Sequence, residues 1–129
     1  QTQFFYCPPG TPGYAMHQDN YFVESDRDSF ASAWIALRDI TPNMGGLVVY
    51  PESHREPILQ VEEIAGRQST SQDKNANRQQ VILPNKYTPL ELIVPKGATI
   101  FLHGHTVHSS YDNKSDKFRY ALLITYLRD

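Results

Sequence analysis

Short apolar segments separated by proline and glycine are the feature that most limits what this chain can fold into. Nine prolines and seven glycines are spread through 129 residues, and both residue types interrupt regular structure at turns. Pro8-Pro9-Gly10 and Pro95-Lys96-Gly97 are the clearest of these breaks. The strands predicted between such breaks cover residues 1–7, 31–40, 47–50, 90–94, 98–103 and 118–127. Many short strands without a long helix predict an all-β sandwich or barrel.

Length and charge limit the class of protein further. A chain of 129 residues is one domain with a single core. The net charge of -2 and the mixing of acids with bases argue against a nucleic-acid groove or a membrane-binding basic patch. No apolar run reaches the roughly 20 residues that a bilayer requires. We therefore expect neither a nucleic-acid partner nor a membrane partner, while the oligomeric state is not predicted.

The chain starts at Gln1 and holds one cysteine, Cys7. A lone cysteine excludes an internal disulfide and fits a reducing compartment, so a cytoplasmic location is expected. Because the first residues already have the pattern of a strand interior, we interpret the sequence as the core of a longer protein.

A long polar stretch interrupts the strand pattern between residues 56 and 87. It exceeds the length of an ordinary connection, which predicts a mobile loop or a lid over a functional site. Within it, residues 59–65 are predicted to form a short helix.

His17-Gln18-Asp19 is a candidate metal motif. In an extended segment, predicted here for residues 14–23, alternate side chains point to the same face. An imidazole and a carboxylate could then share one metal ion, and a distant histidine would complete the 2-His-1-carboxylate set used by non-haem Fe(II) oxygenases.

Two readings compete for the remaining ligand. In the first, His108 joins His17 and Asp19. In the second, His103 and His105 form an H-x-H pair that resembles the opening of the cupin signature after Gly97. The cupin pattern then requires a glutamate where this chain has serines, and it leaves the His-x-Asp motif without a role. If neither His103 nor His105 is a ligand, they are a strand-end histidine and a surface histidine.

Arg119 follows His108 by eleven residues, near the start of the last predicted strand. Antiparallel pairing could return that strand beside the one that leads to His108. A guanidinium group there could hold a carboxylate with two parallel hydrogen bonds. The alternative is that Arg119 is an ordinary surface residue of the strand.

These motifs together resemble the phytanoyl-CoA dioxygenase family of Fe(II)/2-oxoglutarate-dependent oxygenases, which includes the ectoine hydroxylases. The resemblance covers nearly the whole chain outside the polar stretch. It runs through four blocks in order, which are Tyr6 to Asp19, Trp34 to Leu47, Pro51-Glu52-Ser53-His54-Arg55, and Gly97 to Arg119.

The resemblance implies a double-stranded β-helix, or jelly-roll, over residues 1–129. It implies His17, Asp19 and His108 as iron ligands, and 2-oxoglutarate and O2 as co-substrates. Arg119, Ser110, Gln3 and Trp34 match positions that contact 2-oxoglutarate. The implied reaction hydroxylates a C–H bond of a small organic substrate and releases succinate and CO2.

Three further consequences follow from the resemblance. Asp19 favours a hydroxylase, because related halogenases replace this carboxylate with a small residue. Ser109 departs from the glycine that usually follows the distal histidine. The family's helical N-terminal region is absent, which leaves open a jelly-roll fragment that binds metal or ligand without turnover. The cupin-type enzyme centred on His103 and His105 is the other alternative.

Overall fold

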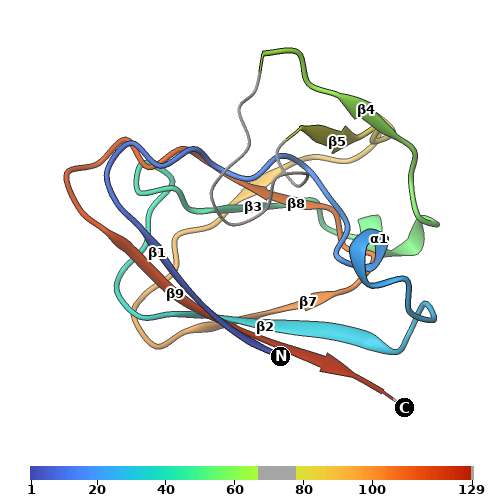
Figure 1. Ribbon diagram of the computed structural model, residues 1–129, viewed down its shortest axis with the longest axis horizontal. Coiled ribbons are helices and arrows are strands. Elements are labelled where there is room, and N and C mark those ends of the chain that lie inside the picture. Colours follow the sequence, from blue (N-terminus) through green and yellow to red (C-terminus); the bar gives the residue numbers. More distant parts are fainter. Residues whose placement is uncertain (67–77, 129) are drawn as a thin grey trace.

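The computed structural model describes residues 1–66 and 78–128, and these residues form a jelly-roll of two facing antiparallel sheets (Figure 1). The larger sheet has the order β1-β9-β2-β7. Its strands are β1 (Thr2–Cys7), β9 (Arg119–Leu127), β2 (Phe30–Ala36) and β7 (Thr99–His103). Strands distant in sequence are therefore neighbours, and the predicted all-β fold is confirmed.

The smaller sheet lies opposite and has the order β6-β3-β8. It consists of β6 (Leu90–Glu91), β3 (Leu47–Val49) and β8 (His108–Ser110). The 3-10 helix η1 (Ser53–Arg55) follows β3 along the chain. The strand predicted for residues 90–94 is shorter than expected, although Val94 forms an isolated bridge with Ile40.

The core lies between the two sheets. Trp34, Ala36 and Ala121 contribute to it from the larger sheet, and Leu47 contributes from the smaller one. The two-residue alternation of strand side chains determines which residues reach this interior. In β1, for example, Cys7 is buried while its neighbour Tyr6 is exposed. The same alternation places Ser32 and Trp34 on one face of β2, and both side chains are buried.

Two local predictions were wrong. Residues 59–65 do not form a helix, because Val61–Glu63 is strand β4, which pairs with β5 (Gln79–Val81) in a separate two-stranded sheet. The segment 14–23 is not extended throughout, because Asn20–Val23 forms one helical turn, α1. At β4, hydrogen bonds to a strand distant in sequence outweigh the local pattern. At α1, local bonds such as that from the Glu24 amide to the Asn20 carbonyl close a helical turn.

The predicted lid falls partly outside the described residues, since residues 67–77 are not among them. In the part of the chain that is described, the only α-helix is the four-residue α1. None of these residues belongs to a helix long and apolar enough to cross a membrane.

Candidate metal and co-substrate site

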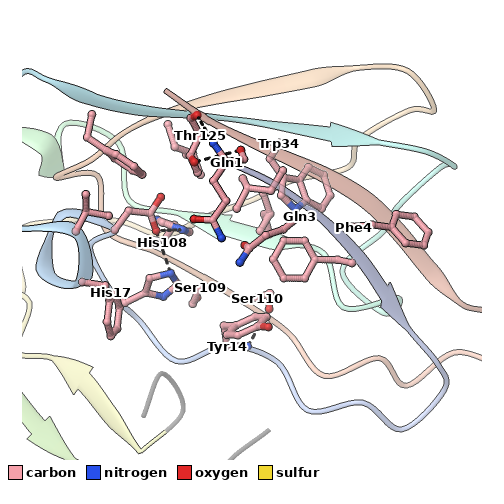
Figure 2. A pocket seen from close by; sticks show the side chains of 18 of the residues that line it. Gln1, Gln3, Phe4, Tyr14, His17, Trp34, His108, Ser109, Ser110 and Thr125 are labelled. Carbon is pink, nitrogen blue, oxygen red and sulfur yellow. Dashed lines mark hydrogen bonds and ion pairs between the residues drawn. The ribbon is translucent and has the colours of Figure 1, made fainter. Parts of the chain in front are cut away.

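The segment before α1 runs antiparallel to β8, and this pairing brings His17 beside His108. The two residues exchange backbone hydrogen bonds, with His17 N to His108 O at 3.0 Å and His108 N to His17 O at 3.1 Å. A Cβ atom at Gly13 would overlap the carbonyl oxygen of Ser110, so only glycine lets this segment lie against the end of β8. The two imidazole centroids end up 4.3 Å apart (Figure 2).

Asp19 completes a three-residue cluster. It lies at the N-terminus of α1 with helical backbone angles, so the turn and not strand alternation directs its side chain. Its Oδ1 atom is 3.4 Å from His17 Nε2 and 3.5 Å from His108 Nε2. Two ligands in adjacent positions at about 2.1 Å from one ion lie roughly 3 Å apart. The separations observed here are thus close to those that a shared ion would set.

Hydrogen bonds determine which nitrogen of each ring faces the cluster. Nδ1 of His17 is 2.7 Å from the Ala15 carbonyl oxygen, and Nδ1 of His108 is 2.9 Å from that of Thr106. A carbonyl oxygen only accepts hydrogen bonds, so each Nδ1 carries the proton and donates it. In the neutral rings both Nε2 lone pairs are therefore directed at the Asp19 carboxylate. Three acceptors gathered in this way are suited to a cation.

The protonation states favour the same interpretation. Burial by itself raises the pKa of Asp19, but the positive charges that His108 and His17 carry when protonated in acid, with a hydrogen bond from Ser32, outweigh it, so the pKa is well below 3.8. Burial and the neighbouring His17 lower the pKa of His108 below 6.5, against the opposing effect of Asp19. Asp19 is thus an anion and His108 is neutral near pH 7, and metal ligands need these forms.

Ser32 and Gln18 support the cluster, although the sequence patterns did not identify them. Ser32 is fully buried and donates a hydrogen bond of 3.0 Å from Oγ to Asp19 Oδ2, which leaves Oδ1 toward the imidazoles. Gln18 is also fully buried, and its side chain bonds only backbone groups remote in sequence. For Ser32, the sequence did offer a signal: it lies two residues before Trp34, so both side chains are on the same face of the strand.

Arg119 is a buried cation on the inner face of β9. Its side chain donates from Nη1 to the Gly45 carbonyl at 2.6 Å and from Nη2 to Cys7 Sγ at 2.9 Å. Among the described residues, its Nε–H has no hydrogen-bond partner and no carboxylate forms an ion pair with it. Burying an uncompensated charge is unfavourable. The guanidinium group thus fits an anionic ligand.

A cavity of about 490 Å³ joins the cluster to Arg119 between the two sheets (Figure 2). All seven residues predicted to form the site line this cavity, which are Gln3, His17, Asp19, Trp34, His108, Ser110 and Arg119. Ser110 Oγ accepts a hydrogen bond of 2.9 Å from the Tyr14 amide, so its own hydroxyl proton can still be donated. The rest of the lining is mostly apolar.

The second reading places the metal at His103 and His105, and neither residue lines that cavity. His103 ends β7 as expected, and its Nε2 is 3.2 Å from Asp28 Oδ1. His105 is buried, not at the surface, and its Nδ1 is 2.9 Å from the Glu56 carbonyl. Among the described residues, the group able to hold a metal is His17, Asp19 and His108.

Comparison with known proteins agrees with this geometry. The family description "Phytanoyl-CoA dioxygenase (PhyH)" matches residues 1–121. Phytanoyl-CoA dioxygenase 1 of Oryza sativa subsp. japonica is 32% identical over 123 residues, covering 95% of this chain and 42% of the rice protein. The Arabidopsis thaliana phytanoyl-CoA dioxygenase is 31% identical, with coverages of 94% and 41%. The chain thus spans less than half the length of these relatives.

Solved structures share the fold at lower identity. The non-heme monooxygenase ThoJ superposes with a TM-score of 0.78 at 21% identity, covering 98% of this chain and 44% of ThoJ. EvdO2 from Micromonospora carbonacea var. aurantiaca, solved in complex with 2-oxoglutarate, gives a TM-score of 0.76 at 20% identity, with coverages of 99% and 52%. Because the family description matches residues 1–121, the chain belongs to the phytanoyl-CoA dioxygenase family.

Proposed function

We propose that this chain forms the core of an Fe(II)- and 2-oxoglutarate-dependent dioxygenase that hydroxylates a C–H bond of a small organic substrate. One observation carries the proposal: a cluster of three metal-binding acceptors and a buried, uncompensated guanidinium group line the same cavity. The first is suited to a cation and the second to a carboxylate, and Fe(II) with 2-oxoglutarate supplies both.

His17, Asp19 and His108 would hold the iron. Two neutral imidazoles and one carboxylate form the ligand set typical of non-haem Fe(II) oxygenases, which leaves other coordination positions for co-substrates. The Nδ1–H bonds to Ala15 and Thr106 fix the orientation of the two rings. Such outer hydrogen bonds keep ligands in position before the metal arrives.

Arg119 would bind the distal carboxylate of 2-oxoglutarate. Its Nε–H lacks a partner in the described part of the chain, while its Nη groups hold the side chain against Gly45 and Cys7. Ser110 could add a hydroxyl hydrogen bond, and Gln3 and Trp34 would contact the co-substrate from the larger sheet. When bound, iron and 2-oxoglutarate with O2 supply the oxidation, releasing succinate and CO2.

The substrate would enter beside α1. Phe22 and Val23 line the cavity and remain 46% and 41% exposed, so they form an apolar rim. Arg119 is the only Lys or Arg in the described lining of the cavity. These features favour an apolar reacting group and no nucleic acid. A cytoplasmic location stays a prediction from the single cysteine.

The test is anaerobic titration of the iron-loaded protein with 2-oxoglutarate, followed by a turnover assay. A visible charge-transfer band should form in the wild type and be lost in Asp19→Ala. Succinate release that rises with an added substrate would separate an enzyme from a jelly-roll that only binds. If Asp19→Ala kept both the band and full iron affinity, the assigned ligand set would be wrong.

A further inference from the structure

Gln18 lies between two proposed metal ligands, but its side chain points away from them into the protein. The side chain is 0% exposed. Nε2 donates to the carbonyl oxygens of Pro57 at 3.0 Å and His105 at 2.9 Å, and Oε1 accepts from the Leu59 amide at 2.8 Å. Both amide donors and the acceptor therefore bond backbone that is 39 or more residues away.

Two of these partners belong to the segment that leads into the β4–β5 hairpin. Pro57 and Leu59 precede β4, which begins at Val61. Gln18 thus holds the segment before β4 (residues 57–59) against the metal motif.

Strand β5, the second strand of the hairpin, is bonded to the same motif. The Val81 amide, at the end of β5, donates to the Met16 carbonyl at 3.0 Å. Tyr21 in α1 also reaches the hairpin, with its hydroxyl 3.4 Å from Gln79 Oε1. Residues 16 and 18 therefore hold the hairpin while residues 17 and 19 face the metal site.

We propose that Gln18 is a positioning residue that fixes the His17–Asp19 pair and couples metal binding to the β4–β5 hairpin. The inference rests on the proposed metal site and adds a coupled element to it. Three hydrogen bonds prevent the backbone between the two ligands from rotating, so the ligands are held in register before the metal binds. Through the same bonds, a metal ion that rigidifies residues 17–19 would also rigidify residues 57–59 and strand β5.

The experiment compares two isosteric changes. Gln18→Glu keeps the acceptor for Leu59 but turns both donors into an oxygen that faces two carbonyls. Asn113→Asp is the matched control, because buried Asn113 also donates to two carbonyls, those of Cys7 and Lys117. Its Oδ1 accepts from the amide and the hydroxyl of Ser115, and both bonds are kept by aspartate. Both changes leave a buried carboxyl oxygen facing two carbonyls, but only the first adjoins the metal motif.

Co(II) is the probe, as a divalent ion that does not need anaerobic handling. We expect Gln18→Glu to weaken Co(II) binding by about 10- to 100-fold, which is the usual loss of metal affinity when a residue that orients metal ligands is changed. Asn113→Asp should stay within about twofold of the wild type, although both variants lose a similar amount of stability in urea. Equal Co(II) affinity in Gln18→Glu and the control would overturn the proposal.

Hydrogen exchange in the wild-type chain gives a second readout that needs no variant. Co(II) should slow exchange of the Leu59 amide, which lies before β4, and of the Val81 amide, which lies in β5. If Co(II) binds and neither amide responds, the coupling is refuted while the metal site stands. If the wild type binds no Co(II) at all, the proposed function fails first and the coupling fails with it.

Discussion

Replacing Ser32 with alanine should weaken metal binding without touching any proposed ligand. Ser32 lies on β2, is 0% exposed, and donates a hydrogen bond of 3.0 Å to Asp19 Oδ2. That bond leaves Oδ1 as the oxygen 3.4 and 3.5 Å from the two imidazole Nε2 atoms. Without the hydroxyl, the carboxylate is free to rotate away from the orientation that faces both rings.

Two magnitudes follow from this geometry. A hydrogen bond to a charged group contributes about 1.5–3 kcal/mol, so the free energy of unfolding of the metal-free protein should fall by about that amount. The Asp19 side chain is only 18% exposed, so water replaces the lost donor poorly. Loss of a partner that orients a metal ligand costs about 10- to 100-fold in metal affinity.

Urea denaturation of the metal-free protein measures the first magnitude, and Co(II) titration measures the second. Ser32→Cys is the matched control, because it retains a group of similar size with a weaker donor and should lie between serine and alanine in both assays. If Ser32→Ala matched the wild type in urea midpoint and Co(II) affinity, the role assigned to Ser32 would be refuted.

Three further outcomes are expected. Arg119→Lys should weaken 2-oxoglutarate binding at least about tenfold in a charge-transfer titration but leave Co(II) affinity unchanged, because an ammonium cannot form the paired hydrogen bonds. His108→Ala should abolish Co(II) binding in a calorimetric titration and His103→Ala should not; the reverse pattern would favour the cupin reading. Burial and His17 lower the pKa of His108 in the folded protein below 6.5, so the unfolded chain binds more protons below that pH. The urea midpoint of the metal-free protein should therefore fall as the pH drops from about 7.5 to 5.5, and a flat profile would contradict the neutral form of His108.

The local patterns were most reliable where a strand has turn residues at both ends. Pro8-Pro9-Gly10 follows β1, which was predicted at residues 1–7 and observed at Thr2–Cys7. The same reasoning failed at residues 59–65, where apolar spacing suggested a helix. There the Val61 to Val81 pairing satisfies the backbone through a partner 20 residues away. A local window does not contain that partner.

The residues around the proposed ligands show the same division. His17, Asp19 and His108 were candidates because their side-chain types bind metals, but the turn at α1 that directs Asp19 was not foreseen. Ser32 and Gln18 have side chains that occur anywhere in a protein. Only their burial and their long-range hydrogen bonds reveal a role.

Turn residues between short strands were enough to predict the fold class, and residue types alone nominated the side chains that could hold a metal and an acid. Which of these candidates lie together depends on the folded chain. Pairing of residue 17 with 108 across the chain formed the cluster and excluded His103 and His105 from it. The Cys7–Arg119 register buried a guanidinium group in the same cavity. Such encounters depend on strand pairing between distant segments, which residue type and spacing leave undetermined.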